Sequence, residues 1–403
     1  MQRPTKKFTA GRMDDATRSD CLVEVELKNR GGVTLGLESK VESLYGDSIR
    51  AELAEACAAL GVGHAAFRIT DQGALPYVLG ARIEAAVRRA LPAIEKEYLP
   101  RPVSRGKVSR VRGRVRRTRL YLPGNEPRFF SNAGLHGPDA VVLDLEDSVA
   151  PGEKDAARLV VRNALRSAEF YGAERMVRIN QGGAGREDLR SIVPQNPDVV
   201  VIPKCEDPDL LRDIGSEIGG LERRHGLVPG ILLLPIIESA LGVVNAYAIA
   251  TSSPRVCALA IGLEDYTADI GVERTMVGLE SFFARMTIVN AAKAAGVQAL
   301  DSVFSDMDDT GGLRDAALRA RSLGFDGMGC IHPRQIEVIH SAFAPSPEEF
   351  RKAVEVVRAA EEAQRRGSGV VALGSKMVDA PVVMRAERIL RLAGLSGAGG
   401  GGL

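Results

Sequence analysis

The chain has 403 residues, of which 45% are hydrophobic, and a formal net charge of +1 at pH 7. This length is too great for one ordinary domain, so we expect at least two. The near-zero net charge excludes a strong overall field for nucleic acid or for a membrane surface.

The first part of the chain predicts a small α+β domain at residues 21–95, preceded by a polar segment, residues 1–20, that we expect to be flexible. The strands alternate apolar and polar side chains, as half-buried strands do, and Gly61 is a stop signal for the first helix. The expected strands are residues 22–27, 34–39 and 65–70, and the expected helices are residues 48–61 and 73–91.

A basic linker follows at residues 96–117. From Arg101 to Arg119 the chain has nine Arg or Lys residues and no acidic residue. Such a run is either a solvated linker or an arm that binds anions or docks a subunit. No aromatic residues are interleaved with the charges, which argues against a nucleic-acid partner.

From residue 119 onward, short apolar runs recur with helix-like stretches between most of them. They lack period-two alternation, as expected for strands buried on both faces. Eight such runs predict a (β/α)8 TIM barrel at residues 118–345. A doubly wound open sheet is the alternative, although no G-x-G-x-x-G follows a strand. The runs are residues 119–124, 139–147, 175–180, 198–204, 231–239, 256–265, 298–304 and 326–332.

The C-terminal part predicts a helical segment at residues 346–393 around a loop at 367–381, followed by a disordered glycine-rich tail at 394–403. Five scattered cysteines without C-x-x-C spacing indicate a reducing compartment, so we expect a cytoplasmic protein. The polar N-terminus predicts no signal peptide, and the absence of an 18-residue apolar run predicts no membrane partner.

Two carboxylates end buried-looking runs: Glu238 in ILLLPIIES and Asp265 in CALAIGLEDYTAD. In a barrel the strand ends meet at the active-site face, and two acids on neighbouring strands make an oxygen-only site suited to Mg²⁺. A third run, RMVRIN, carries Arg178, whose guanidinium suits a carboxylate substrate. Together they predict metal-assisted chemistry on a small acid.

Other polar residues end these runs. We expect a catalytic or supporting role for Glu146, whose neighbour Asp147 either supports the metal site or caps the next turn. Asn180 is a candidate for substrate binding, and Lys204 either binds substrate or pairs with one of these acids. A lone glutamate at a strand end is more often a salt-bridge partner than a metal ligand; the combination of two acids with an arginine favours the metal.

The segment RLYLPGNEPRFFSNAGLHGPDAVVLDLEDSVAPGEKDAAR resembles the opening of the citrate lyase beta subunit and its HpcH/HpaI aldolase relatives. MVRIN, VIPK, IIESALGVVNA, GLEDYTADIG, GFDGMGCIHPRQI and GSKMVDAP follow in the family's order, so the resemblance covers about residues 117–393. It implies a TIM barrel that uses Mg²⁺ to make or break a carbon–carbon bond between a 2-oxo acid and an acyl thioester. It also implies Glu238 and Asp265 as metal ligands and Arg178 as the carboxylate-binding residue. Asp379 would be a catalytic acid that handles protons at the acetyl carbon and comes from a neighbouring subunit, which implies a homotrimer or hexamer.

The first domain resembles the citrate lyase acyl carrier (gamma) subunit, through SDCLVEVEL, VESLYGDSIRAELAEACAALGV and ITDQGALPYVLGARIEAAVRRA. In that family a serine before the first strand carries phosphoribosyl-dephospho-CoA, in a segment like G-T-L-E-S-S-D. Here the segment is G-R-M-D-D-A-T-R-S-D, and Ser19 is the available serine. Aligning its S-D pair on the family's second serine puts Arg18 at the modified position; Thr17 is a chemically possible substitute.

The resemblance leaves two enzymatic functions open. The first is cleavage of a citryl thioester to oxaloacetate and an acetyl thioester, with a separate citrate lyase alpha subunit as partner. The second is a malyl-CoA or citramalyl-CoA type of reaction on free CoA thioesters, in which the first domain is a relic or an oligomerisation module. A non-catalytic scaffold that uses the basic arm is disfavoured, because the two acids and the arginine are all present.

Overall fold

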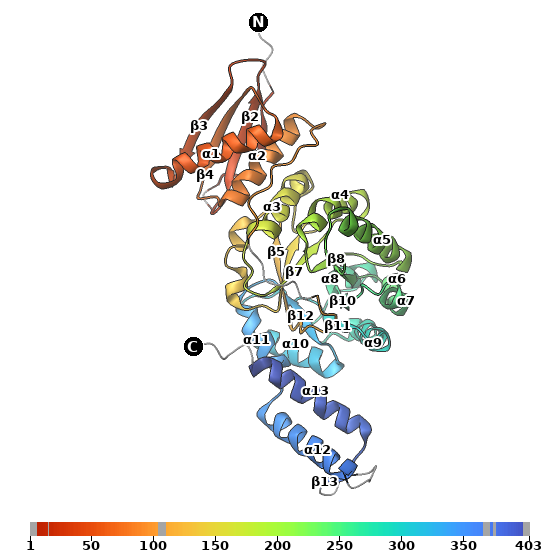
Figure 1. Ribbon diagram of the computed structural model, residues 1–403. Coiled ribbons are helices and arrows are strands. Elements are labelled where there is room, and N and C mark those ends of the chain that lie inside the picture. The colour runs from red at the N-terminus through yellow and green to blue at the C-terminus, as the bar shows by residue number, and fades with distance from the viewer. Residues whose placement is uncertain (1–5, 15, 104–109, 366–370, 374–375, 398–403) are drawn as a thin grey trace. The chain divides into compact units, whose positions relative to one another are not determined.

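The computed structural model describes residues 6–14, 16–103, 110–365, 371–373 and 376–397 (Figure 1). The chain divides into two compact units, residues 1–336 and 337–403. The first unit contains the N-terminal domain and the barrel, and the second contains the C-terminal helices.

The N-terminal domain is a four-stranded sheet in the order β1-β2-β4-β3, packed against two helices. In β2 every second residue of the first five is buried, as the alternating sequence predicts. α1 ends at Gly61, whose φ of 75° is in the left-handed region that glycine favours. The elements are β1 (Phe8–Ala10), β2 (Cys21–Leu27), β3 (Val33–Ser39), α1 (Glu42–Leu60), β4 (Ala65–Asp71) and α2 (Pro76–Ala90).

The segment expected to be flexible, residues 1–20, differs from that expectation where the structure describes it. β1 pairs with β2, and Thr17 and Asp20 are buried. The Asp20 carboxylate accepts two hydrogen bonds from the buried Arg82 guanidinium, at 2.9 and 2.7 Å. A three-residue edge strand and one long-range ion pair order this segment, and neither leaves a recognisable pattern in the local sequence.

The eight predicted runs form a closed, all-parallel barrel in the order β10-β11-β12-β5-β6-β7-β8-β9, with helices around its outside (Figure 1). The TIM-barrel prediction is confirmed and the open sheet is excluded, because β12 pairs with β5 and closes the cylinder. The strands are β5 (Thr118–Pro123), β6 (Ala140–Asp144), β7 (Glu174–Arg178), β8 (Val199–Ile202), β9 (Leu232–Ile237), β10 (Ala258–Ile261), β11 (Gln298–Asp301) and β12 (Gly327–Cys330).

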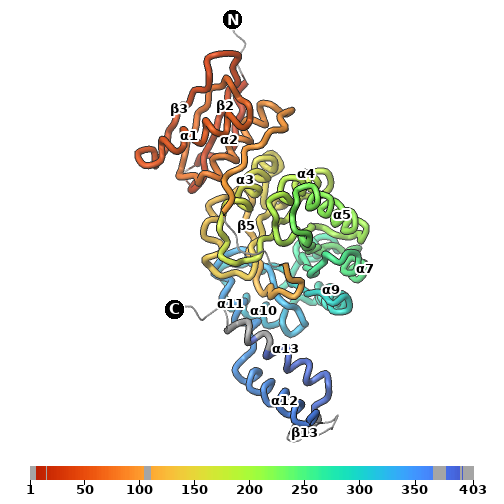
Figure 2. The backbone as a smooth tube through the Cα atoms, in the orientation of Figure 1, coloured from red at the N-terminus to blue at the C-terminus, as the bar shows by residue number. Residues whose placement is uncertain are grey.

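The helices alternate with these strands, as the backbone trace shows in chain order (Figure 2). They are α3 (Lys154–Ser167), α4 (Gly182–Ile192), α5 (Pro208–Arg224), α6 (Ala240–Val244), α7 (Ala246–Thr251), α8 (Leu263–Asp269), α9 (Leu279–Ala294), α10 (Thr310–Leu323) and α11 (Arg334–Phe343). Short 3-10 turns occur at η1 (Pro127–Phe129), η2 (Ala133–His136), η3 (Pro151–Glu153) and η4 (Val193–Gln195).

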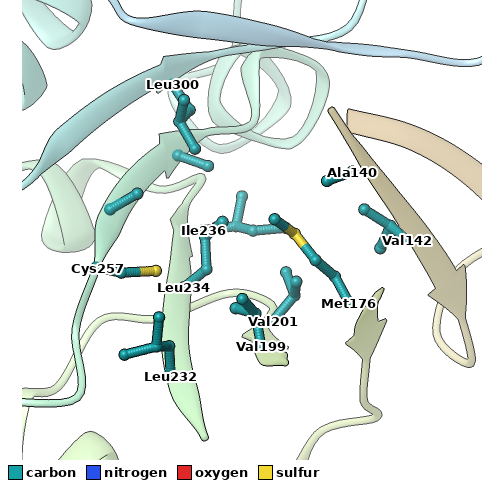
Figure 3. Packing of buried hydrophobic residues seen from close by; sticks show 12 residues of the cluster. Ala140, Val142, Met176, Val199, Val201, Leu232, Leu234, Ile236, Cys257 and Leu300 are labelled. Carbon is teal, nitrogen blue, oxygen red and sulfur yellow. The ribbon is translucent and has the colours of Figure 1, made fainter. Parts of the chain in front are cut away.

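Small and branched apolar side chains fill the barrel interior (Figure 3). Val142 of β6, Met176 of β7 and Ile236 of β9 belong to this buried cluster. Side chains alternate along a strand, so the inward positions two residues further on are those of Asp144, Arg178 and Glu238. The same alternation that builds the apolar core therefore places charged groups at its C-terminal end.

The basic segment becomes a strap at the N-terminal ends of the strands, in the part that the structure describes from Arg110. The Arg116 guanidinium makes a bidentate ion pair with Glu174 at the start of β7, and both side chains are buried. Arg112 donates to the carbonyl of Val256, and Arg117 pairs with Asp139. These arginines bind the barrel itself, so in this part the segment is neither a solvated linker nor a free anion-binding arm; residues 104–109 lie outside the described residues.

The second unit contains α12 (Pro347–Arg365), a short hairpin of β13 (Val371–Leu373) and β14 (Lys376–Val378), and α13 (Ala380–Gly397). α13 continues through the first residues of the tail expected to be disordered, and residues 398–403 lie outside the described residues. No described helix is long and apolar enough to cross a membrane. All five cysteines are free thiols and buried.

Candidate active site

A cavity of about 460 Å³ lies at the C-terminal ends of the barrel strands. Its lining includes Asp144, Arg178, Glu238 and Asp265, which come from four different strands or the segments that follow them. The barrel therefore brings together the two acids and the arginine that the sequence analysis singled out.

The two candidate metal ligands differ in their surroundings. Glu238 directly follows β9 and is only 5% exposed, whereas the Asp265 side chain, in the first turn of α8, is 46% exposed. Glu238 Oε1 accepts a hydrogen bond of 2.6 Å from the backbone N–H of Lys204. Burial, together with the nearby Asp265 charge, raises the pKa of Glu238 to about 8. This buried acid therefore favours a neutralising partner, which a proton or a cation can provide.

The donor set fits Mg²⁺. The described residues contain no cluster of three or more His, Cys, Asp or Glu side chains with metal-binding geometry. A site of two carboxylates suits Mg²⁺, which commonly keeps several waters and takes one or two protein carboxylates together with substrate oxygens. Glu238 and Asp265 are thus the residues that would hold the ion.

Gly262 provides the space that Glu238 occupies. A Cβ atom at this position would lie 2.4 Å from Glu238 Oε2 and 2.9 Å from Glu238 Cβ. We therefore expect Gly262→Ala to displace the carboxylate and to weaken Mg²⁺ binding by about 10- to 100-fold, as changes to groups that orient a ligand commonly do. Isothermal titration calorimetry with Mg²⁺ measures this effect.

The matched control for this substitution is Gly220→Ala in α5, where the added Cβ meets no atom within 4 Å. It should leave Mg²⁺ affinity unchanged. Unchanged affinity in Gly262→Ala would show that the Glu238 carboxylate does not need its present position to bind the metal.

Arg178 is held by carboxylates of the protein. Its Nε and Nη2 donate to Asp144 at 2.6 and 2.7 Å, and its Nη1 lies 3.1 Å from Glu146. Burial alone would raise the pKa of Asp144, but the hydrogen bonds and charge of Arg178 outweigh burial and hold it below its ordinary value. The Arg178 guanidinium also lies over the ring of Tyr121, 5.6 Å from its centre.

These contacts leave Arg178 able to bind a substrate. A guanidinium has five N–H donors. Asp144 accepts from Nε and Nη2, and Nη1 lies 3.1 Å from Glu146 and 3.6 Å from Asp147, so the second N–H on Nη2 is left for a substrate carboxylate. The protein carboxylates fix the plane of the guanidinium, which limits the entropy lost when a substrate binds.

Asp144 is a site residue that sequence reasoning missed. It lies directly opposite Arg178 in the parallel pairing of β6 and β7. The signal was present in the run DAVVLDLED, where the inward positions of Ala140 and Val142 predict an inward Asp144 two residues later.

Glu146 and Lys204 are not among the residues that line the cavity; they pair with each other. Lys204 Nζ is 3.2 Å from Glu146 Oε1, 3.4 Å from Asp147 Oδ1 and 4.0 Å from Asp265 Oδ1. Burial raises the pKa of Glu146 above its ordinary value. Of the two alternatives for Lys204, this geometry shows the ion pair with the acids. Glu146 contacts Arg178, and the backbone N–H of Lys204 contacts Glu238, so the two residues orient these site groups.

The structure does not bring Asn180 into the cavity. Its backbone N–H and side-chain amide both donate to Asp188 at 2.8 Å, and its Oδ1 accepts from Lys154 at 2.6 Å. These hydrogen bonds fix the loop after β7, two residues beyond Arg178.

The candidate attachment segment contacts the barrel domain where the structure describes it: Arg12 pairs with Glu126, and Arg128 donates to the carbonyl of Ala16. Ser19 is partly exposed with a φ of 54°, and its N–H donates to the carbonyl of Gln72. Arg18 is exposed, whereas the Thr17 hydroxyl is buried and donates to Asp14. Thr17 is thus closed to modification in this conformation, and Ser19 is the more accessible hydroxyl.

Asp379 lies in the second unit, directly before α13. It is exposed, and its Oδ1 accepts a hydrogen bond from the backbone N–H of Val382 in the first turn of that helix. Its catalytic role stays a prediction.

Comparison with known proteins identifies the barrel. Residues 117–333, more than half of the chain, match the family model of the HpcH/HpaI aldolase/citrate lyase family. The chain belongs to this family. Residues 6–90 match a second family model, that of the malonate decarboxylase delta subunit, an acyl-carrier type of domain, which agrees with the resemblance noted for the first domain.

Among relatives in the aldolase/citrate lyase family, the citrate lyase subunit beta of Escherichia coli K12 is 43% identical, over 70% of this chain and 95% of its own length. The mitochondrial citramalyl-CoA lyase of Homo sapiens is 32% identical, over 69% and 85% respectively. A crystal structure of the protein CitE from Mycobacterium tuberculosis, in complex with magnesium, acetoacetate and coenzyme A, is 33% identical with a TM-score of 0.58, and covers 70% of this chain and all of that one. The protein is therefore a lyase.

Proposed function

We propose that the protein cleaves a citryl thioester, carried by CoA or an acyl carrier, to oxaloacetate and an acetyl thioester with Mg²⁺. The observation that carries this proposal is the convergence of Glu238, Asp265 and Arg178 on one cavity at the active-site end of the barrel. The similarity to citrate lyase beta subunits supports the choice of substrate.

Three residues of the chain share the work of binding. Glu238 and Asp265 would hold the metal ion, and the remaining N–H on Nη2 of Arg178 binds the substrate carboxylate by a charge-assisted hydrogen bond. Bound Mg²⁺ would supply Lewis-acid polarisation of the oxygen that becomes the oxo group. Glu146 and Lys204 keep these groups in place, which preserves the alignment of the bond to be broken.

Cleavage removes the proton of the substrate hydroxyl and adds one at the acetyl carbon, and the proton added there needs a separate donor. In our proposal Asp379 of a neighbouring copy supplies it, which requires a homo-oligomer such as a trimer or hexamer. A separate alpha subunit is the proposed partner if the acyl group stays on a carrier. Asp379→Asn measured in mixtures with an inactive barrel variant tests delivery between copies, because activity regained on mixing requires it.

A second candidate is cleavage of free CoA thioesters such as malyl-CoA or citramalyl-CoA. The specific observation in its favour is the attachment segment, where Arg18 occupies the position aligned with the modified serine and Asp20 is anchored to the barrel-facing Arg82. Arg82 also donates to the carbonyl of Asn125, in the loop after β5. This anchoring restricts the travel that a swinging carrier needs.

Two measurements decide between these candidates. Steady-state cleavage of citryl-CoA, malyl-CoA and citramalyl-CoA, with Mg²⁺ and with EDTA, establishes the substrate; turnover that EDTA does not change would exclude the metal-dependent mechanism. The intact mass of protein purified from its native host, followed by peptide mapping of residues 1–30, shows whether Ser19 carries phosphoribosyl-dephospho-CoA. An unmodified mass in a host with active transferase favours free CoA thioesters.

The raised pKa of Glu238 predicts that Mg²⁺ binding releases a proton. A carboxylate must lose its proton to bind the metal. With a pKa of about 8, Glu238 in the metal-free protein is largely protonated at pH 7, so Mg²⁺ affinity should rise by up to about tenfold per pH unit until about pH 8 and then level off. Calorimetry at pH 7 in buffers of different ionisation enthalpy counts the released protons, and the same titration at pH 9 should show almost none.

A further inference from the structure

Arg119, on β5, is a buried arginine whose charge has no carboxylate partner. Its side chain is 2% exposed and forms part of the cavity wall. Nη2 donates to the backbone carbonyl of Asp301 at 2.8 Å, but Nε and Nη1 have no hydrogen-bond partner among the residues that the structure describes. The Asp301 carboxylate is paired with Arg285 instead.

Comparison with the other buried arginines makes this exceptional. Four arginines are among the largest fully buried side chains of the described residues. Arg82, Arg116 and Arg162 each make two hydrogen bonds to one carboxylate, of Asp20, Glu174 and Glu84 respectively. A buried guanidinium without such a partner is costly, and a buried donor without an acceptor adds to that cost. The one arginine that lacks a partner is the one that lines the cavity.

The position of the Arg119 guanidinium complements that of Arg178. Its hydrogen bond to Asp301 places it at the end of β11, whereas Arg178 stands at the end of β7. In the closed barrel, β11 and β7 lie on opposite sides of β9, which is followed by Glu238. Two positive groups therefore flank the metal-binding acids from different sides of the cavity.

The chemistry of the substrates shows what a second positive group can do. Oxaloacetate, the oxo acid released from a citryl thioester, has a second carboxylate beyond the one next to its oxo group. Pyruvate, released from citramalyl-CoA, has a methyl group in place of the carboxymethyl group of oxaloacetate. Glyoxylate, released from malyl-CoA, has a hydrogen at that position. Arg178 accounts for the first carboxylate, and a buried second carboxylate requires its own charged partner.

We propose that Arg119 binds the second carboxylate of a dicarboxylic 2-oxo acid and so selects citryl thioesters over citramalyl and malyl thioesters. This inference rests on the proposed function, because it names the substrate feature that the same cavity recognises. In it Arg119 is a specificity-determining residue: it pairs with a charge on the substrate and takes no part in moving protons.

The test uses two matched variants of the full chain. Arg119→Gln removes the charge but keeps a donor for the Asp301 carbonyl, and Arg119→Lys keeps the charge. In Arg119→Gln we expect kcat/KM for citryl-CoA to fall about 100-fold, while that for citramalyl-CoA changes little, because truncating one member of a buried charged pair affects only the substrate that completes the pair. Arg119→Lys should retain part of the preference. An equal loss for both substrates would assign Arg119 a structural role and overturn the proposal.

Binding of the oxo acids separates this proposal from the proposed function. With Mg²⁺ present, oxaloacetate should bind the unmodified protein more tightly than pyruvate, and Arg119→Gln should abolish the difference. If oxaloacetate binds more tightly and Arg119→Gln abolishes the difference, but citryl-CoA is not cleaved, the role of Arg119 stands and the proposed reaction is refuted. If citryl-CoA is cleaved and Arg119→Gln does not change its rate, the proposed reaction stands and the role of Arg119 is refuted. Equal affinities of the unmodified protein for the two oxo acids would refute the role of Arg119 even if the variants failed to fold.

Discussion

Glu238→Gln is expected to abolish Mg²⁺-dependent cleavage, with kcat lowered about 1,000-fold or more, since a bound metal contributes several kcal/mol of transition-state stabilisation. Glutamine has nearly the shape of glutamate and can still accept the 2.6 Å hydrogen bond from Lys204, so the loop should keep its position. What is lost is the negative charge that opposes Mg²⁺. Activity and Mg²⁺ titrations of the same preparation measure both consequences.

The same substitution, which lowers activity, is expected to raise the stability of the metal-free protein. Glu238 has a folded-state pKa raised to about 8, so the metal-free protein loses stability as pH rises from the unfolded value of 4.5 through about 8. Glutamine has no proton to lose, so metal-free Glu238→Gln should be more stable than the unmodified protein at pH 8 and nearly equal to it at pH 5. Lower stability of the variant at pH 8 would contradict the claim that burial and the Asp265 charge destabilise the ionised Glu238 carboxylate in the metal-free protein.

The barrel and its two acids could be predicted from the sequence because their signals are local. Most strands lie in short, largely apolar runs; Glu238 directly follows β9, and Asp265 lies in the first turn of α8, which begins two residues after the end of β10. Parallel strands of a barrel end at one face, so the order of the runs is enough to bring these side chains together. The fold supplies the long-range information that the local pattern lacks.

The environment of Arg178 could not be predicted in the same way. The sequence predicts that Arg178 binds a carboxylate of the substrate but not which groups hold it, and the structure shows that Asp144 and Glu146 do so. Which carboxylate meets which arginine depends on the register between β6 and β7, and an apolar run specifies that register poorly. The same holds for the basic strap, whose arginines find carbonyls and carboxylates that lie far away in the sequence, such as Val256.

Arg119 illustrates a further limit of sequence reasoning. In the sequence, Arg119 stands at the start of an apolar run and is also the last residue of the basic segment, so its position alone does not indicate a site. Its inward direction, its burial and its lack of a carboxylate become visible only when the strand, its neighbours and the cavity are seen together. A charged residue inside a predicted barrel strand is itself a signal, since such positions favour apolar side chains.

The interface between the first domain and the barrel rests on polar side chains as well as apolar ones. Asn163 of α3 donates to the carbonyl of Tyr77 in α2, and Arg162 of α3 donates to the carbonyl of Tyr98 and makes a bidentate ion pair with Glu84 of α2. Both members of that pair are fully buried. This contact fixes the carrier-like domain against the barrel, and a carrier that must travel between active sites would have to break it.

Glu84→Gln is accordingly expected to lower the free energy of unfolding by about 3 kcal/mol, because it removes the buried carboxylate that Arg162 contacts with two nitrogens and leaves only the half-exposed Glu97, 3.2 Å from Nη1. The glutamine keeps the shape of the side chain, so the decrease in the free energy of unfolding comes from the lost charge and not from a cavity. Urea unfolding followed by circular dichroism measures it, and a second transition would show that the first domain separates before the barrel unfolds.

Asp155→Asn provides the matched control, because Asp155 pairs with Arg89 across the same two helices but its side chain is 51% exposed. An exposed pair contributes only about 0–1 kcal/mol, so this variant should unfold almost as the unmodified protein does. A double variant, Glu84→Gln with Arg162→Met, should recover part of the loss, since removing both charges leaves neither one buried alone. Equal effects of Glu84→Gln and Asp155→Asn would mean that water reaches the Glu84–Arg162 pair, and that the first domain is free to leave the barrel.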